Sequence, residues 1–337
     1  MHYMVGRHMK TLLSNTLLIL LTSFFLVLPI ATYSEGLRFG IVGKSTTDGN
    51  FIDTWKGCNE VALLSGDECF LLGHFGSADA RQQLSAINHA LNNKPLDAIA
   101  LSVTNSNYLA QGLADLDIPL ITFDSPFAEA DNHLSKAYIG IDNVEFGRQL
   151  AALVKKLKPN GGRVCIFSTL HDTNIAQRVW GVRQVLSGYD QLPRDSRLQG
   201  QTAWTESDRC PLNTADNIPR ALNQLQATLQ ADLADIYIAV GWWPIVDSQA
   251  YRQTIANYQQ KFRNHEVIMV AGVGKAEAEY DELLKQHLLH GYVSINFPEI
   301  GRLSAKVMAD LAQGKTLSDN TIFVANIVRI VEEVAEQ

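Results

Sequence analysis

The sequence has no basic cluster and few charged residues. Lys and Arg number 28 against 35 Asp and Glu, the formal net charge is −7, and charged residues make up only 19% of the chain. Proteins that bind nucleic acid usually carry a basic patch that neutralises phosphates. We therefore expect no nucleic-acid partner.

Motifs of catalysis and cofactor binding are also missing. The sequence contains no GxSxG elbow, no P-loop and no HExxH pair. GIVGKS at 40–45 resembles half of a phosphate loop, but Arg38 stands where the opening glycine belongs, so we interpret the segment as a strand end. No histidines have metal-ligand spacing, and the four cysteines match no zinc pattern. These absences predict a protein that is not an enzyme and holds no metal and no cofactor.

The N-terminus has the pattern of an export signal. Arg7, His8 and Lys10 precede a mostly apolar stretch, and Thr32 and Ser34 can occupy the −3 and −1 positions of a cleavage site. An uncleaved membrane anchor is the competing interpretation, because about 16 apolar residues is near the lower limit of a span. We expect residues 1–34 to be a cleaved signal peptide and the mature protein to be periplasmic.

Export permits the cysteines to form disulfides. Cys58 and Cys69 lie across one predicted helix–turn–strand unit, and we expect these two to be bridged. We interpret Cys165, in RVCIFS, as a buried small hydrophobic residue.

From Leu37 onward, short apolar runs alternate with amphipathic helical patterns, and a second run of the same kind begins after AYIGID at 137–142. The expected elements include a strand at 197–204 and one helix at 251–262. This alternation is typical of parallel sheets covered by helices on both faces. Because no low-complexity linker interrupts it, the pattern predicts an α/β fold of two doubly wound parallel-sheet lobes.

Ligands of such sheets lie beyond the carboxyl ends of the strands. The residues there provide carboxylates, amides, hydroxyls and aromatic faces. Hydroxyl pairs of a sugar match carboxylates and amides, and its C–H faces pack on aromatic rings. The set predicts binding of a small polyhydroxylated ligand.

Trp242 and Trp243 end a predicted strand and precede Pro244. Alternation along a strand sends one indole inward and the other outward. We expect at least one of them to lie in the pocket. The alternative is that both pack under a neighbouring helix.

For some of the polar residues that are candidates for ligand binding, capping of a turn or helix is an alternative role. Two roles fit Asp124 in TFDS, capping the following turn and binding a ligand. Asn174 is the natural N-cap of the helix that follows it, and Asp142 and Asn143 are placed to cap the helix at 144–157.

The chain resembles the ribose-type periplasmic sugar-binding proteins, which are type I periplasmic binding proteins related to the lactose-repressor effector domain. The resemblance extends from Leu37 to Ile330 and is carried by the order of GKSTTDGNFIDTWKGCNEVA, LDAIALSVTNSNYL, IPLITFDSP, AYIGIDNVEFGR, TNIAQRVWGV and INFPEIGRLSAKVMADLAQGK. It implies two lobes that close over a ligand, joined by a hinge of three crossings near 139–142, Asn296 and Val324. The implied domains are an N-terminal lobe of 35–139 plus 297–322 and a C-terminal lobe of 140–296 plus 323–337.

The resemblance also implies site residues. It places Asp48, Asn50 and Phe51 where the family contacts its sugar, and Asp124 on the family's sugar-binding aspartate. The full set of expected ligand-binding residues is Asp48, Asn50, Phe51, Asp124, Ser125, Asn174, Trp242, Trp243 and Asn296.

The sequence departs from the family pattern at three places. Ala176 replaces a ligand-contacting arginine, GWWP at 241–244 replaces an Asn-Asp pair, and AGVG at 271–274 lacks the aspartate that often follows this strand, whereas Arg178 falls on a second and more structural arginine. We therefore expect a cleft that is more aromatic and less charged than a ribose site.

The implied function is capture of a carbohydrate as the substrate-binding component of an ABC-type importer, with an inner-membrane permease as partner. The alternative is a periplasmic sensor that presents its bound form to a histidine kinase or a chemoreceptor. Both use the same ligand-driven closure of two lobes. The difference lies in the partner surface, not in the cleft.

Overall fold

The structure is a computed structural model that describes residues 36–331 with the exception of 77, 94, 171 and 201. The chain divides into two compact units, Met1–Gly36 and Leu37–Gln337. The predicted signal peptide, residues 1–34, lies outside the described residues.

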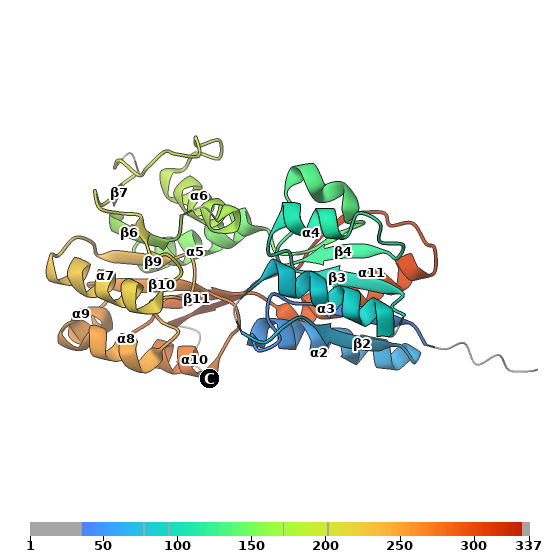
Figure 1. The fold of residues 1–337 in the computed structure, drawn as a ribbon. Helices are drawn as coiled ribbons and strands as arrows, with labels where there is room; N and C mark the ends of the chain where they lie inside the picture. Colours follow the sequence, from blue (N-terminus) through green and yellow to red (C-terminus); the bar gives the residue numbers. More distant parts are fainter. Residues whose placement is uncertain (1–35, 77, 94, 171, 201, 332–337) are drawn as a thin grey trace, which may run out of the picture. The chain divides into compact units, whose positions relative to one another are not determined.

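The N-terminal lobe is built on a sheet in the order β12-β5-β4-β3-β1-β2, in which every neighbouring pair is parallel. Its strands are β1 (Arg38–Val42), β2 (Glu68–Leu72), β3 (Ala98–Leu101), β4 (Leu120–Phe123), β5 (Tyr138–Gly140) and β12 (Thr321–Phe323). Its helices are α2 (Gly49–Ser65), α3 (Ala80–Asn93), α4 (Ser106–Gly112), η1 (Glu129–Leu134) and α11 (Phe297–Ala312) (Figure 1).

Both faces of this sheet are buried. Phe39 and Ile41 belong to the hydrophobic cluster that includes residues of α2 and α11, whereas Val42 belongs to the cluster that includes residues of α3 and α4. Successive side chains of a strand point to opposite faces, so an apolar run with no polar face is what a doubly covered strand needs. Because its strands are parallel, the polar residues that follow them all lie at the same edge of the sheet, the one formed by the carboxyl ends of the strands.

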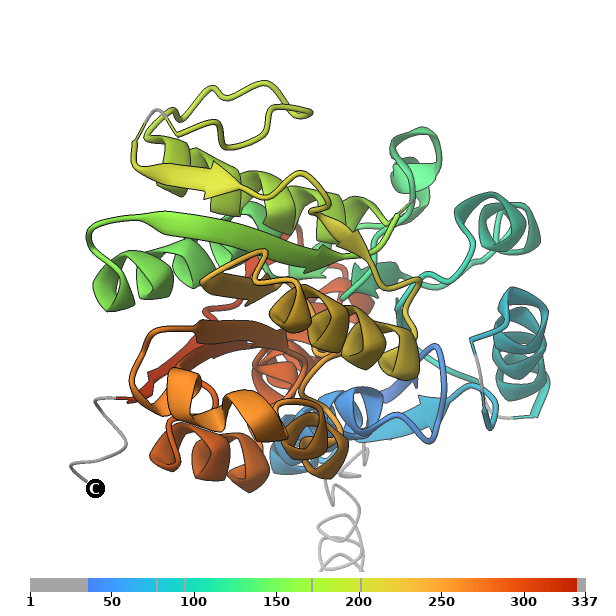
Figure 2. The same cartoon turned by 90° about the vertical axis from the view of Figure 1, so that its left-hand side faces the viewer.

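The C-terminal lobe has a sheet in the order β13-β11-β10-β9-β6-β7, with β8 also pairing β6. Its strands are β6 (Gly162–Ser168), β7 (Trp204–Glu206), β8 (Leu212–Asn213), β9 (Ile236–Ala239), β10 (Ile268–Val273), β11 (Gly291–Ser294) and β13 (Ile327–Ile330). Its helices are α5 (Asn143–Leu157), α6 (Thr173–Ser187), α7 (Ile218–Gln230), α8 (Ser248–Thr254), η2 (Ala256–Tyr258), α9 (Gln259–Arg263) and α10 (Ala278–Lys285) (Figure 2). Within the described part of the chain the pairs are parallel except that β13 runs antiparallel to β11.

Across residues 36–331 the chain passes between the two sheets at three points. The first lies between β5 and α5, the second between β11 and α11, and the third between β12 and β13. These are the places where the sequence predicted the hinge. The α/β class with two doubly wound sheets is confirmed.

In each lobe one pair of helices packs so closely that only glycine fits at the contact. A Cβ atom on Gly57 of α2 would lie 2.0 Å from the carbonyl oxygen of Pro298 in α11, and one on Gly147 of α5 would lie 2.0 Å from that of Arg178 in α6. Any side chain at these positions would push the helices apart. The glycines therefore fix the helices whose first turns border the cleft.

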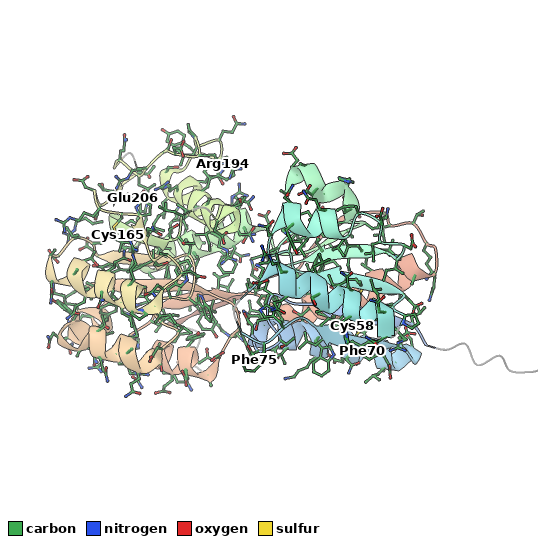
Figure 3. All side chains as sticks on the ribbon, viewed as in Figure 1. Cys58, Phe70, Phe75, Cys165, Arg194 and Glu206 are labelled. Atoms are coloured by element: carbon green, nitrogen blue, oxygen red, sulfur yellow. A yellow bond between two sulfur atoms is a disulfide. The ribbon has the colours of Figure 1, made fainter. Side chains whose placement is uncertain are left out.

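Two disulfides are present, one in each lobe (Figure 3). Cys58 in α2 is bridged to Cys69 in β2, which confirms that prediction. Cys165 in β6 is bridged to Cys210, so the interpretation of Cys165 as an unpaired hydrophobic residue was wrong. The side chain is buried as expected, but a partner 45 residues away is brought beside it by the segment that leads into β8.

Two predicted elements differ from the structure. The described residues among 197–203 form no strand, because the chain turns at Gly200 and Ala203, both with positive φ, and β7 begins only at Trp204. The helix predicted at 251–262 is divided into α8, η2 and α9. Tyr251, Ile255 and Phe262 are all buried at helical spacing, so the apolar pattern runs across the break.

Candidate ligand-binding cleft

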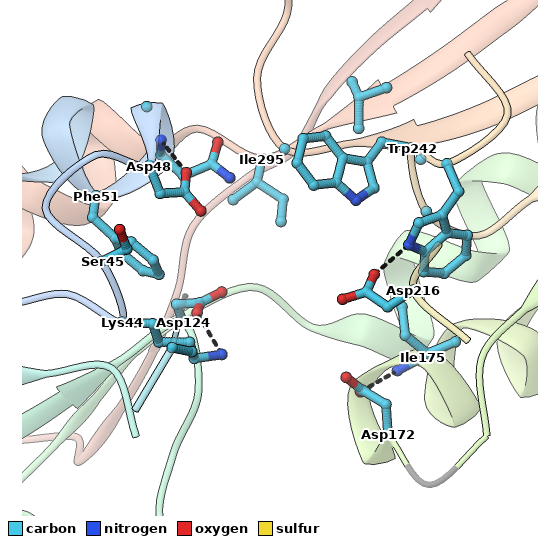
Figure 4. A pocket seen from close by; sticks show the side chains of 18 of the residues that line it. Lys44, Ser45, Asp48, Phe51, Asp124, Asp172, Ile175, Asp216, Trp242 and Ile295 are labelled. Atoms are coloured by element: carbon cyan, nitrogen blue, oxygen red, sulfur yellow. Dashed lines mark hydrogen bonds and ion pairs between the residues drawn. The ribbon is translucent and has the colours of Figure 1, made fainter. Parts of the chain in front are cut away.

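The largest concentration of predicted site residues lines a cavity of about 1030 Å³ at the carboxyl ends of the strands. Both lobes contribute to its walls. Six of the nine expected residues line it: Asp48, Asn50, Phe51, Asp124, Trp242 and Trp243. Figure 4 shows the side chains of Asp48, Phe51 and Asp124 facing those of Trp242 and Asp216 across an open space.

Asp124 is held by a polar network in the N-terminal lobe. Its Oδ2 atom accepts a hydrogen bond of 2.8 Å from Ser102 Oγ and lies 3.4 Å from Lys44 Nζ, which donates to Ser125 Oγ at 2.6 Å. Asp124 has φ 57°, a conformation in which aspartate is tolerated better than most residues. Within the described residues no hydrogen bond or ion pair reaches Oδ1, which is therefore able to accept a ligand hydroxyl.

The loop between β1 and α2 supplies the other side of this wall. Asp48 is the N-cap of α2 and accepts a hydrogen bond of 2.8 Å from the backbone N–H of Asn50. Burial, together with the charge of Asp124, raises the pKa of the Asp48 carboxyl. Phe51 is buried and packs edge-on against Phe123, with ring centroids 6.0 Å apart. The capping bond fixes the carboxylate of Asp48 at the rim, and the ring of Phe51 gives the wall an apolar patch.

The two tryptophans of GWWP have different surroundings. Trp242 is 41% exposed, whereas Trp243 is 3% exposed. The indole N–H of Trp243 donates to Asp216, and its ring lies over Gly241, where a Cβ would approach to 2.7 Å. β9 ends at Ala239, so both tryptophans lie in the turn that follows the strand and not on the strand itself. Trp243 is anchored in the core, and Trp242 presents the more exposed indole to the cleft.

Arg178 of α6 also lines the cleft and links three elements. Its Nε donates to Asn143 Oδ1 at 2.8 Å and its Nη1 to the carbonyl oxygen of Val240 at 3.0 Å, while the guanidinium lies 4.3 Å from the ring centre of Phe146. Burial lowers the pKa of Arg178 to about 10, so the group stays charged at neutral pH. These contacts agree with a structural role, and they place a positive charge beside Asp124 and Asp172.

Three expected residues do not line the main cavity. Ser125 and Asn174 border a second cavity of about 1030 Å³, which shares Lys44 and Asp172 with the first. Asn296 borders neither of these two cavities and instead caps α11, accepting from the backbone N–H of Glu299 at 3.2 Å.

The expected cap of α6 is also corrected. The N-cap is Asp172, whose side chain accepts from the backbone N–H of Ile175, and Asn174 lies inside the first turn. The N-cap of α5 is Asp142, one of the two residues that the sequence indicated for this role.

The cleft contains more charged side chains than the sequence-predicted set. Besides Asp48 and Asp124, the structure brings Asp172 and Asp216 into the same cavity, together with the cationic side chains Lys44 and Arg178. Asp216 gave no local signal as a ligand residue, because Asp-Asn before a helical pattern indicates a cap. The actual cap of α7 is Asn217. Only the long-range contact with Trp243 identifies Asp216 as part of the cleft.

No group of three or more His, Cys, Asp and Glu side chains suited to hold a metal ion occurs in the described residues. In the same residues, no helix is both long and apolar enough to cross a membrane.

Two helix-covered sheets with a cleft at their carboxyl edges are the architecture of a two-lobed binding protein. Residues 39–316 match the family model of the periplasmic binding protein domain, and the chain belongs to that family. This confirms the resemblance inferred from the sequence, and the family is periplasmic. Sequence comparison with curated proteins gives no match.

Many solved structures share the fold. An ABC transporter solute-binding protein from Agrobacterium vitis, bound with alpha-D-tagatopyranose, is 19% identical with a TM-score of 0.71 and covers 89% of this chain and 96% of its own. GanP, a glucose-galactose binding protein from Geobacillus stearothermophilus, is 15% identical with a TM-score of 0.68, and the match covers 89% of this chain and 99% of GanP. A chain of the XylFII–LytSN complex is 15% identical with a TM-score of 0.64, and the match covers 88% of this chain and 98% of that chain. At these identities the likeness establishes the fold.

Proposed function

We propose that this protein captures a small sugar or sugar derivative in the cleft between its lobes and acts as the periplasmic substrate-binding component of an ABC-type importer. The observation that carries the proposal is the pairing of an open indole, Trp242, on one wall with a hydrogen-bonding carboxylate, Asp124, on the facing wall. An indole packs on the C–H face of a sugar, and a carboxylate accepts from its hydroxyls. The sugars bound by similar solute-binding proteins support the same ligand class.

The two walls belong to different lobes, so a ligand that contacts both would stabilise the closed arrangement. The lobes are already linked by an ion pair of 2.8 Å between Lys275 Nζ, which follows β10, and Asp53 Oδ2 of α2. A Cβ on Gly274 would lie 2.7 Å from Asn50 Oδ1, so glycine lets this loop approach the first turn of α2. We propose that the lobes, bounded as the sequence predicts, rotate about the three crossings and meet along this edge.

We also propose that residues 1–34 are a cleaved signal peptide, as the N-terminal pattern indicates. Intact-mass measurement of protein from the periplasmic fraction tests this. A mature chain that begins near Glu35 is the expected result, and a membrane-bound chain that retains residues 10–34 would contradict it.

A sensor is the second candidate function, with a histidine kinase or chemoreceptor as partner in place of a permease. One structurally similar chain was solved in the XylFII–LytSN complex, and this observation supports the sensor as the second candidate. Uptake of the identified ligand by a strain that lacks the gene separates the two. Loss of uptake supports the importer, and normal uptake with a lost transcriptional or chemotactic response supports the sensor.

The cleft itself is tested by a thermal-shift screen of the mature protein against monosaccharides, sugar derivatives and polyols, followed by calorimetry. Asp124→Asn keeps the shape of the side chain but removes its charge, and we expect binding to weaken by about 1.5–3 kcal/mol, or roughly ten- to a hundredfold. Asp115→Asn, an exposed change in the same lobe, is the matched control and should bind normally. If no sugar binds, or if Asp124→Asn binds as tightly as the control, the proposal is wrong.

A further inference from the structure

The cleft carries more negative charge than a neutral ligand requires. Four carboxylates line it, Asp48, Asp124, Asp172 and Asp216, against the cationic side chains Lys44 and Arg178 among the described residues. The lining therefore has a formal excess of two negative charges. Which of the carboxylates remain uncompensated decides where a ligand charge would lie.

Both cations are engaged by the protein. Lys44 pairs with Asp124 and donates to Ser125. Arg178 directs two of its nitrogens to Asn143 and to the carbonyl oxygen of Val240, and its charge lies within electrostatic reach of Asp124 and Asp172. Lys44 and Arg178 thus offset Asp124 and Asp172; the charge of Lys44 also reaches Asp48, but as the smallest of the influences on that carboxyl, and no ion pair joins the two.

Asp48 and Asp216 remain, one from each lobe. Neither forms an ion pair within the described part of the chain: Asp48 accepts a backbone N–H in the cap of α2, and Asp216 accepts the neutral indole N–H of Trp243. Burial, and then the nearby charge of Asp124, raise the pKa of Asp48, and the charge of Lys44 offsets this only in part. A positive charge placed between the two walls would be attracted by both carboxylates.

An aromatic face lies beside these carboxylates. Trp242 is 41% exposed and lines the same cavity as Asp216 (Figure 4). A cation is attracted both to the face of an indole and to a carboxylate. A neutral sugar would use the same indole for its C–H face but would leave the charge excess in place.

We propose that the ligand carries a protonated nitrogen, so that the substrate class is an amino sugar or amino polyol whose ammonium group lies between Asp48 and Asp216 and against Trp242. This rests on the proposed function, because it specifies the ligand of the same cleft. The ammonium contacts both lobes and contributes to closure, and an anionic sugar is repelled by the same carboxylates.

Matched ligand sets test the proposal by calorimetry on the purified mature protein. Each set holds a neutral hexose, its 2-amino derivative, the N-acetylated amine and the corresponding uronic acid: glucose, glucosamine, N-acetylglucosamine and glucuronate, and the galactose equivalents. We expect an amino sugar to bind about tenfold or more tighter than its neutral parent, and the N-acetyl and uronate forms to lose that advantage.

Two variants assign the effect to residues. Asp216→Asn keeps an acceptor for the Trp243 indole, and Asp48→Asn keeps an N-cap for α2. We expect each to reduce the preference for the amine over the neutral sugar by about tenfold while the affinity for the neutral sugar changes little. Asp208→Asn, an exposed residue upstream in the same segment and outside the cleft lining, makes the same charge change and should leave the preference intact.

The outcomes separate this inference from the proposed function. Neutral sugars that bind as tightly as their amines, or a preference that survives in both Asp216→Asn and Asp48→Asn, overturn the amino-ligand inference and leave sugar capture standing. Binding by neither neutral nor amino sugars overturns both proposals. Thermal unfolding of each variant close to that of the unaltered protein shows that a lost preference arises in the cleft.

Discussion

In the N-terminal lobe Asp124 is held by polar contacts between neighbouring strand ends, whereas in the C-terminal lobe Trp243 is held by burial and by a hydrogen bond to a distant segment. Asp124 is positioned by Ser102 and Lys44, which follow adjacent strands of one sheet. On the facing wall, Trp243 is fixed by burial and by Asp216. Replacing Asp124 should therefore affect binding, and replacing Trp243 should affect folding as well.

The largest contrast is expected between the two adjacent tryptophans. Trp243→Ala deletes a buried indole, and such deletions cost about 3–5 kcal/mol in the free energy of unfolding. Trp242→Ala removes a partly exposed indole and should cost below about 1 kcal/mol. Urea unfolding of both variants measures the difference. Equal losses of stability would mean that both indoles pack in the core and would remove Trp242 from the cleft.

The two disulfides compare the lobes directly. The bridge Cys165–Cys210 closes a loop with a sequence separation of 45, and Cys58–Cys69 one of 11. Because a longer loop gains more entropy in the unfolded chain when it is opened, replacing both cysteines by alanine should cost about 4 kcal/mol for the first pair and about 3 kcal/mol for the second.

Denaturant unfolding of the two double variants gives the ranking, with the reduced unaltered protein as the combined control. A larger loss from the Cys58–Cys69 pair would contradict the loop-length argument.

The smallest expected effect is a sensitivity to acid in the C-terminal lobe. His290 is fully buried, accepts a hydrogen bond at Nδ1 from the backbone N–H of Met269 and donates from Nε2 to the carbonyl oxygen of Phe262, an arrangement that fits the neutral ring. Burial, with lesser contributions from His265 and His287, lowers the pKa of His290 to about 3. The unfolded chain takes up this proton near its ordinary pKa of about 6.5.

The contribution to stability is therefore fully present above pH about 6.5 and is lost as the pH falls toward 3. Between pH 6.5 and 5 the loss should be about 2 kcal/mol. His290→Gln keeps a donor and an acceptor but cannot titrate, so the free energy of unfolding should fall less between pH 7 and pH 5. His89→Gln, an exposed change in the N-terminal lobe, should leave the pH slope unchanged. The same slope in all three proteins would rule out His290 as its source.

Local signals in the sequence predicted much of the architecture. The alternation of apolar strands and amphipathic helices predicted both sheets, and Asp142 was recognised as the cap of α5 because a cap bonds only to residues two or three positions away. The prediction failed at 251–262, where buried residues keep a helical spacing through a 3₁₀ segment. It also failed at 197–204, where the apolar pattern did not reveal the turn at Gly200.

The site was predicted less completely than the fold. Six of the nine expected residues line the cavity, because the pattern located the strand ends and the family resemblance indicated which residues there bind a ligand. Asn296 was misplaced, since a capping asparagine and a ligand-binding asparagine have the same sequence signature. Asp216 was missed because its partner Trp243 lies 27 residues further along the chain.

The sequence by itself determined the fold class, the order of the elements and the edge of each sheet where a ligand can bind, because these depend on side-chain periodicity and on bonds between near neighbours. Only the tertiary structure decided that Cys165 pairs with Cys210, that Trp242 is the open indole, and that Asp48 and Asp216 face one cavity without a cationic partner among the described residues. Each of these is a contact or a charge balance between segments far apart in the chain. No local pattern encodes it, because the distance between such segments is set by the packing of whole sheets and helices.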